Sequence, residues 1–336
     1  MALPLMERGN IVRLISQKTP SFAEAYDIFV KSYSIHQMRN AVDALAPITD
    51  IFHCHNEPSW FVAIVKEMTD KPVILDVHDS YLARLSPTEA DELEDADIEY
   101  LRVTVEERNN FQLADGLVFP SQPFAELILK EFRLTQPYIV LPSMVQRNLY
   151  AYNGQSWLGG LVYEGRVDLS TELEKNKHKS GFTYTMYEEL ARKAKEIGID
   201  LHLYARKDEE FVKLYGETAV LHKPVTYDKL MLKISRHDWG LVGNIHETSE
   251  WKVAFPNKLF EYIAAGVPVV ALNADYCADF LIETGFGIVV KSLEELAERW
   301  EEHTEIRKVI YKGRMKYCME NNIHQLEQLY EAVLNG

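Results

Sequence analysis

The sequence has little cysteine and no long apolar run. Its three cysteines, Cys54, Cys277 and Cys318, are widely spaced and odd in number, which fits neither a disulfide framework nor a paired Cys-x-x-Cys metal site. No stretch approaches the roughly 18 apolar residues of a membrane-spanning helix. The first ten residues lack the basic start and apolar core of a signal peptide. These absences predict a cytoplasmic protein, which leaves room only for peripheral membrane contact.

Basic residues are also scarce relative to acidic ones. The 36 lysines and arginines face 51 acidic residues, which gives a formal net charge of −15. A polyanion is repelled by such a surface, so nucleic acid is not an expected partner. The hydrophobic fraction of 47% and the charged fraction of 26% are those of a globular protein. A length of 336 residues is comfortable for two domains.

Apolar runs bounded by turn residues alternate with segments of helical spacing, in two series. This alternation is typical of α/β domains with parallel, helix-covered sheets. In the first series, the segments with helical spacing are residues 29–45, 60–68 and 106–113. The expected strands of the first series are 11–15, 48–53, 72–77, 116–119 and 138–141. Those of the second series are 160–163, 200–204, 218–221, 239–242, 267–272 and 287–290.

The turn-rich stretch 143–160 separates the two series. We therefore predict an N-terminal Rossmann-like domain over 1–150 and a second Rossmann-like domain over 151–315. The charged, proline-free segment 293–334 has helical spacing and predicts two helices. We expect its last part, 316–336, to be a C-terminal helix that packs back on the N-terminal domain.

The most informative segment covers residues 254–270 and reads AFPNKLFEYIAAGVPVV. Pro256 favours a helix start, and Gly266 favours the end of that helix just before a buried strand. Free backbone N–H groups at such a helix start suit a phosphate, and Lys258 adds a cation. The carboxylate of Glu261, one turn later, could accept two hydrogen bonds from a ribose diol. Alternatively, Lys258 and Glu261 form an ordinary exposed ion pair.

This segment resembles the Pro-x-Lys-x-x-Glu-Tyr-x-Ala-x-Gly-x-Pro-Val-Val signature of the GT-B glycosyltransferases, specifically the retaining enzymes of family 4. The resemblance implies two Rossmann-like domains that face a cleft, and a nucleotide-sugar donor held mainly by the C-terminal domain. It places Asn257, Lys258 and Glu261 at the donor, with Glu261 on the ribose. It implies no metal and no cofactor besides the donor substrate.

One position departs from the pattern. In family 4, the glutamate on the ribose is the second of a Glu-x7-Glu pair, whose first member meets the donor sugar. Val253 stands at that first position here. Glu247 and Glu250 are nearby carboxylates that could take its place.

Further matches follow the chain order of the fold. Residues 162–167, VYEGRV, resemble the first strand and turn of the donor domain, which implies that Arg166 contacts the diphosphate. The family's partner lysine has no clear match, and Lys175, Lys177 and Lys179 are candidates. Residues 222–230 and 235–241 resemble the segment next to the nucleobase, which makes Pro224 and Val225 its predicted neighbours.

In the N-terminal half, residues 50–55, DIFHCH, and 73–79, VILDVHD, resemble two successive strand ends at the cleft. His78 aligns with the histidine that family 4 places beside the donor sugar, so it is the predicted catalytic residue. Histidines and a carboxylate at strand ends can also bind zinc, which offers His53, His55, His78 and Asp79 as a second interpretation. His53 could equally be a packed core histidine.

The start of the expected fold is incomplete. A GT-B N-terminal domain opens with a strand and a glycine-rich loop before its first helix. Here, residues 5–14 resemble the end of that helix running into the second strand. We therefore expect the N-terminal domain to lack the first strand and its loop.

The resemblance implies transfer of a sugar from a nucleotide-sugar to a hydroxyl of a glycan or lipid-linked glycan, with retention of configuration. Two other functions fit the same fold. One is a non-catalytic GT-B homologue that binds a nucleotide, a glycan or a protein partner. The other is a nucleotide-sugar epimerase, which needs no acceptor. Fold-level resemblance identifies neither the sugar nor the base.

Overall fold

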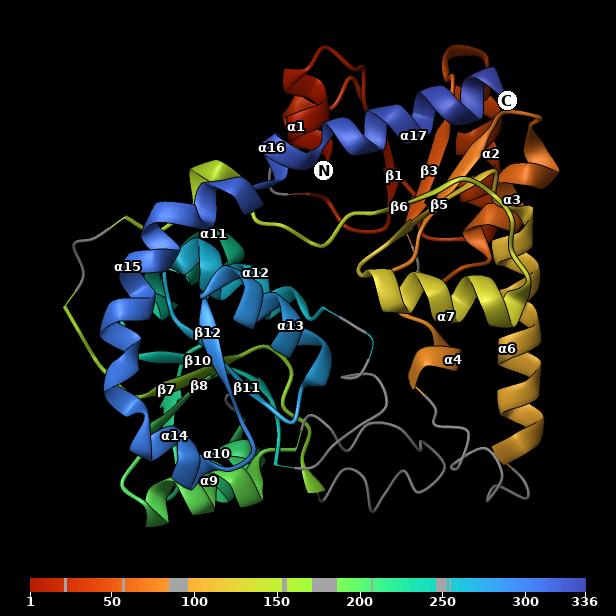
Figure 1. The fold of residues 1–336 in the computed structure, drawn as a ribbon. Helices are drawn as coiled ribbons and strands as arrows, with labels where there is room; N and C mark the ends of the chain where they lie inside the picture. Colours follow the sequence, from red (N-terminus) through yellow and green to blue (C-terminus); the bar gives the residue numbers. More distant parts are fainter. Residues whose placement is uncertain are drawn as a thin grey trace. The chain divides into compact units, whose positions relative to one another are not determined.

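The computed structural model describes residues 1–20, 23–55, 58–84, 96–152, 156–170, 186–206, 208–245, 253 and 255–336, without the side chains of 84 and 96–103. The chain forms two compact units. Unit 1 comprises residues 1–142 and 319–336, and unit 2 comprises residues 143–318. The sequence places the corresponding divisions after residues 150 and 315. Each unit is an α/β layer structure with parallel strands (Figure 1).

Unit 2 is built on one six-stranded sheet in which every neighbouring pair is parallel. Its strand order is β9-β8-β7-β10-β11-β12. Each of the six apolar runs predicted as strands overlaps with one of these strands. They are β7 (Leu161–Glu164), β8 (Leu201–Tyr204), β9 (Val220–His222), β10 (Trp239–Gly243), β11 (Val269–Leu272) and β12 (Gly287–Val290).

Helices cover both faces of this sheet, because each face carries its own apolar cluster. One cluster joins β7 and β10 to Leu230 and Phe260, on α11 and α12. The other joins the strands to Leu190 and Phe211, on α9 and α10. The helices of unit 2 are α9 (Glu188–Glu196), α10 (Glu209–Tyr215), α11 (Tyr227–Ile234), α12 (Asn257–Ala265), α13 (Asp275–Thr284), α14 (Leu293–Glu298) and α15 (His303–Gly313).

The C-terminal segment is divided into more helices than the two that the sequence predicts. After α14 and α15, it continues through a 3-10 turn into α16 (Met319–Asn322) and α17 (His324–Asn335). Helix α17 packs on unit 1, where Tyr330 Oη lies 2.7 Å from His53 Nδ1 and Glu327 pairs with Arg8 at 2.6 Å. None of the described helices combines the length and the apolarity that crossing a bilayer requires.

In the described part of unit 1, six strands form two parallel sheets. The strands are β1 (Arg13–Ser16), β2 (Ile28–Lys31), β3 (Phe52–His55), β4 (Val73–Asp76), β5 (Gly116–Phe119) and β6 (Tyr138–Val140). The helices are α1 (Ala2–Glu7), α2 (Ile35–Leu45), α3 (Phe61–Met68), α4 (Tyr81–Arg84), α6 (Ala96–Leu113) and α7 (Gln122–Phe132). The prediction of a helix over 29–45 is wrong at its start, because residues 29–31 belong to β2 and pair with β1.

Unit 1 has two separate sheets, whereas the single sheet of unit 2 is joined by its inner strand β7. Strand β1 pairs with β2, and the other sheet has the order β3-β4-β5-β6. If β7 were removed from the sheet of unit 2, β8 and β9 would remain as a pair, and β10, β11 and β12 would form a second group. This is the arrangement of unit 1, a pair of strands and a separate sheet. Within the described residues, unit 1 therefore has no counterpart of β7, as expected for a domain without its first strand.

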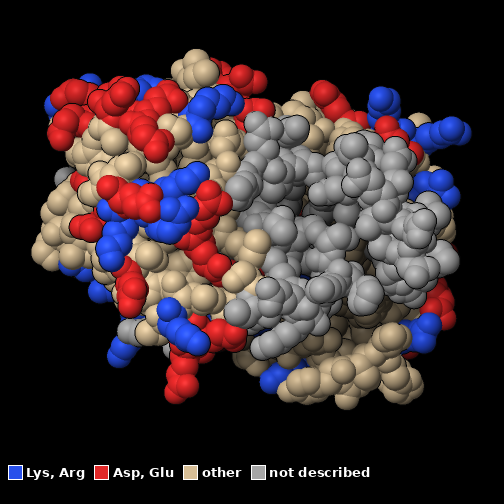
Figure 2. Space-filling model, turned by 90° about the horizontal axis from the view of Figure 1, so that it is seen from below, with Lys and Arg blue, Asp and Glu red and all other residues tan. Residues whose placement is uncertain are grey.

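The charges on the described surface are intermixed. Figure 2 shows acidic and basic side chains side by side on one face, and no continuous basic field is visible among the atoms described there. A phosphate backbone needs such a field, so this face does not favour one.

Candidate functional site

Helix α12 has the boundaries that its sequence predicts. Pro256 has extended backbone angles, φ −70° and ψ 145°, and the helix begins at Asn257. It ends at Gly266, whose φ of 73° lies in the left-handed region where glycine is favoured. Strand β11 follows within three residues. The start of α12 therefore presents N–H groups without helical acceptors, the arrangement that suits an anion.

A pair of buried carboxyl groups lies beside this helix start. The side chain of Glu261 forms a hydrogen bond with Glu164, at the end of β7, and receives another from the Tyr227 hydroxyl. Glu164 and Glu261 are each 7% exposed. Burial and the neighbouring Glu164 carboxyl raise the pKa of Glu261 well above its ordinary value. A ligand with two hydroxyls could replace Glu164 as the hydrogen-bond partner of Glu261.

Lys258 lies against the same carboxyl groups, and its ammonium is 5.0 Å from the centre of the Tyr163 ring. Burial opposes its charge, but Tyr163 and the carboxyls of Glu164 and Glu261 outweigh burial and raise the pKa of Lys258. The alternative of an ordinary exposed ion pair is therefore wrong, since Glu261 is buried and both groups belong to a larger polar cluster.

Arg166 follows the turn at Gly165, whose φ of 113° requires the freedom of a glycine. The guanidinium is exposed, and its Nε lies 2.7 Å from Oδ1 of Asp168. The Tyr163 hydroxyl donates to the Arg166 carbonyl at 2.9 Å, which fixes the turn. An anion that binds Arg166 would share the guanidinium with Asp168 or replace it.

A pocket of about 270 Å³ opens at the same end of the sheet as this turn. The predicted base neighbours Pro224 and Val225 line it, together with Glu164 and Gly165. The remaining wall consists of Tyr204, Ala205, Arg206 and Leu230. The pocket thus places the predicted base neighbours next to Glu164, one member of the carboxyl pair.

Several predicted contacts are not placed. Glu247 and Glu250, the suggested substitutes for the missing glutamate, lie outside the described residues, as do Lys175, Lys177 and Lys179. Val253 is described and is half-buried in a turn. Glu164 is a site residue that sequence reasoning missed. Its only signal is its position, as the last residue of β7 before the glycine turn.

Unit 1 holds a second polar cluster at the ends of β3 and β4. Oδ2 of Asp76 lies 3.0 Å from His55 Nδ1, 3.1 Å from His78 Nε2 and 3.9 Å from His53 Nε2. Burial opposes ionisation of Asp76, but His55 and His78 hold its pKa well below the ordinary value. Burial also opposes protonation of His78, but Asp76 and Asp79 outweigh it and raise the pKa of His78. Asp76 was missed, and it fixes the predicted catalytic histidine.

The structure brings together a different set of candidate zinc ligands from the one that the sequence suggests. Asp76 is the carboxylate at this cluster, and the ligand atoms of Asp76, His53 and His55 lie within 4.8 Å of one another. However, the Nδ1 of His53 is already taken by the hydroxyl of Tyr330 at 2.7 Å. Burial lowers the pKa of His53 to about 3. The side chain of His53 is 14% exposed and hydrogen-bonded to α17, which favours a packed structural histidine, and this role stays a prediction.

His53 is expected to make the protein sensitive to acid. Its pKa is about 3 when folded, against about 6.5 when unfolded, so its contribution to stability is present above pH 6.5 and is lost on acidification. At pH 5, the loss of unfolding free energy is about 2 kcal/mol. Denaturant titrations at pH 7 and pH 5 measure it. His53→Gln should lose less on acidification, whereas the exposed-site control His36→Gln should match the parent. Equal losses in all three proteins would contradict the assignment.

Comparisons with known proteins agree with this geometry. The profile of the family described as "Glucosyltransferase 3-like, C-terminal domain" matches residues 181–322. No curated protein sequence matches the chain. Sucrose-phosphate synthase from Thermosynechococcus elongatus is similar in structure, with a TM-score of 0.69 at 14% identity over 99% of this chain and 91% of that one.

Two further solved structures are similar. A trehalose-6-phosphate synthase, studied for "glycosyltransfer with retention", has a TM-score of 0.55 at 14% identity over 90% of this chain and 80% of that one. The pneumococcal O-GlcNAc transferase GtfA, solved with UDP and GlcNAc, has a TM-score of 0.56 at 12% identity, and the match covers 89% of this chain and 60% of that one. At these identities the similarity shows the fold. The chain has the GT-B fold of glycosyltransferases.

Proposed function

We propose that this protein is a cytoplasmic glycosyltransferase of the retaining, family 4-like type. It takes a hexosyl group from a nucleotide-sugar and passes it to a hydroxyl of a glycan or lipid-linked glycan, the latter through peripheral membrane contact. The observation that carries the proposal is the buried Glu164–Glu261 pair beside Lys258, at the edge of a pocket lined by Pro224 and Val225.

Each part of a nucleoside diphosphate has a matching group in unit 2. The base fits the pocket against Pro224 and Val225. The two ribose hydroxyls donate to Glu261, and they replace its hydrogen bond with Glu164. The diphosphate meets Lys258 and the first N–H groups of α12, at Asn257, while Arg166 reaches it from the turn after β7.

The proposed catalysis is electrostatic. As the bond from the anomeric carbon to the diphosphate oxygen breaks, Arg166 and Lys258 stabilise the negative charge that grows on the diphosphate. The acceptor oxygen bonds to the anomeric carbon through an oxocarbenium-like state, and its proton leaves with the diphosphate. His78, whose imidazole lies 3.1 Å from Asp76, is the residue that the family resemblance assigns to the donor sugar. The similarity to a retaining trehalose-6-phosphate synthase supports retention of configuration.

Arg166→Ala is expected to weaken the binding of a stabilising nucleoside diphosphate about tenfold, the effect of losing one exposed charge-assisted hydrogen bond. A panel of UDP- and GDP-sugars, screened for a rise in melting temperature, first identifies the nucleotide. Isothermal titration then measures its affinity for both proteins. Arg192→Ala is the matched control, because Arg192 is also exposed and also pairs with a carboxylate, Glu196, at 2.6 Å.

Affinity that is unchanged in Arg166→Ala would remove Arg166 from the diphosphate site. Product analysis then separates the three candidate functions. Sugar on the acceptor, or hydrolysis of the donor, supports a transferase. Nucleotide binding without either reaction supports a non-catalytic homologue. A changed sugar in the nucleotide pool without an acceptor supports an epimerase.

A further inference from the structure

Three histidines from separate elements of unit 2 converge on one another. His202 lies on β8, His222 ends β9, and His237 lies in the connection before β10. Nδ1 of His202 is 2.9 Å from Nε2 of His222, and one ligand atom of each of the three residues lies within 4.8 Å of the others. The ring centroids of His202 and His222 are 5.2 Å apart, with planes inclined at 23°. The ring of His237 lies 4.4 Å from that of His202 at 50°, and 5.9 Å from that of His222 at 72°.

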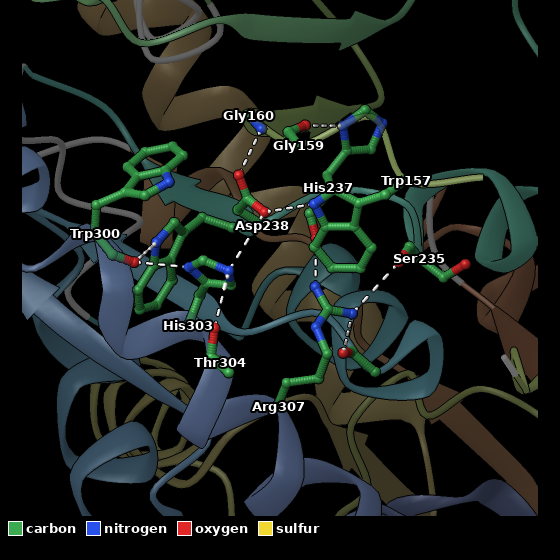
Figure 3. A network of polar contacts seen from close by, with 12 residues as sticks. Trp157, Gly159, Gly160, Ser235, His237, Asp238, Trp300, His303, Thr304 and Arg307 are labelled. Carbon is green, nitrogen blue, oxygen red and sulfur yellow. Dashed lines mark hydrogen bonds and ion pairs between the residues drawn. The ribbon is translucent and has the colours of Figure 1, made fainter. Parts of the chain in front are cut away.

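The ring of His237 is held in one orientation. Its Nδ1 lies 2.7 Å from the carbonyl oxygen of Gly159, which can only accept, so Nδ1 carries the proton. The lone pair of Nε2 accepts from the Tyr204 hydroxyl at 3.2 Å, a contact that a bound metal ion would replace. Figure 3 shows the contact with Gly159 next to Asp238, whose carboxylate accepts from Trp157 Nε1 at 2.9 Å and from the Gly160 N–H at 2.8 Å. An N–H bonded to a carbonyl is the usual second contact of a metal-binding imidazole.

His202 has a nitrogen that the fold leaves unsatisfied. The residue is 5% exposed, and its Nε2 is buried without a hydrogen-bond partner. A buried polar atom without a partner costs free energy, so the hydrogen bonds of the fold do not fully satisfy this imidazole, whose other nitrogen, Nδ1, faces His222.

We propose that His202, His222 and His237 form a binding site for a divalent transition metal ion of the Zn²⁺ class, with the fourth position open to water. Zn–N bonds of about 2.0–2.1 Å place tetrahedral ligand atoms about 3.3–3.4 Å apart. Nδ1 of His202 and Nε2 of His222, which lie 2.9 Å apart here, need to separate by only a few tenths of an ångström to reach that distance. Imidazole ligands favour zinc, copper or nickel over magnesium or calcium.

The position of the site suggests its effect. His222 ends β9, which forms one edge of the sheet, and its ring stacks on Tyr204 at 4.1 Å. Tyr204 in turn lines the pocket proposed for the base. A bound ion would therefore link β8, β9 and the start of β10, and would stiffen one wall of that pocket. Metal binding itself requires no nucleotide, so it is tested independently of the proposed function.

The test uses full-length protein without a histidine tag, titrated with ZnCl₂ alone and with CoCl₂ alone. We expect one ion per chain, a higher melting temperature with Zn²⁺, and the intense visible bands of tetrahedral Co²⁺. His222→Gln, at the sheet edge, should weaken binding at least tenfold. His36→Gln, an exposed histidine of unit 1, should bind like the parent.

Two results would overturn the proposal. One is the absence of saturable binding, or a six-coordinate Co²⁺ spectrum, in the parent protein, a result that needs no variant to fold. The other is binding that His222→Gln and His202→Asn leave unchanged while His55→Gln removes it, which would assign the ion to the Asp76 cluster of unit 1. Circular dichroism of each variant establishes that it is folded before its affinity is compared.

Discussion

Glu261→Ala is expected to weaken binding of the stabilising nucleoside diphosphate about 100-fold, or about 2.7 kcal/mol. The carboxylate is the proposed acceptor for both ribose hydroxyls, and each hydrogen bond to a charged group contributes about 1.5–3 kcal/mol. The substitution also takes the buried carboxyl of Glu164 away from its hydrogen-bond partner. Isothermal titration of the parent and the variant, at the same pH and salt, measures the loss.

A set of matched variants separates this effect from a loss of folding. Glu261→Gln keeps the size of the side chain and a carbonyl oxygen, so we expect it to retain more affinity than the alanine variant. Glu209→Ala removes an exposed carboxylate from α10 in the same unit and should bind like the parent. If Glu261→Ala keeps its fold and its full affinity, the ribose lies elsewhere and the donor site is misassigned.

The sequence predicts most of the architecture, because buried parallel strands appear as short apolar runs between amphipathic helices. All six strands of unit 2 follow from this pattern. The absence of a first strand from unit 1 is a prediction of the resemblance to GT-B enzymes and not of this pattern. The pattern fails over residues 28–31. That run, IFVK, lies close before α2, so one helical window covers both elements. Only its pairing with β1 makes it a strand, and pairing is not local in sequence.

Residue spacing predicts the site only where its residues share one element, because Arg166, Pro224 and Val225 are named by the family resemblance and not by spacing. Asn257, Lys258 and Glu261 all lie on α12, so their spacing along one helix indicates their proximity. Glu164 lies on β7, nearly a hundred residues earlier, and only the folded chain brings it to Glu261. The sequence predicts Asp76 only as part of a buried strand. Its partners His55 and His78 lie at the ends of two different strands. Contacts across a sheet require its register, which the sequence alone does not give.

Gly240→Ala is expected to lower the unfolding free energy of unit 2 by about 3 kcal/mol, the upper end for overpacking a core. A methyl group at this position on β10 would lie 2.4 Å from Cγ of the Tyr262 ring. Tyr262 is fully buried, and its hydroxyl donates to the carbonyl of Val162 at 3.1 Å, so the ring has no open space to enter. Because Tyr262 follows Glu261 on α12, moving the ring also moves the proposed ribose contact, and nucleotide binding should weaken with stability.

A double-mutant cycle tests the cause of this loss. Tyr262→Leu removes most of the ring, so Gly240→Ala should cost less in its presence, and we expect the double variant to be more stable than additivity predicts by at least about 1 kcal/mol. Four of the five tryptophans, those at 157, 239, 251 and 300, belong to unit 2. Their fluorescence during denaturant unfolding therefore follows this unit. Additive losses would mean that the methyl group does not act through Tyr262, and the close approach of β10 to α12 would then not be what requires glycine at position 240.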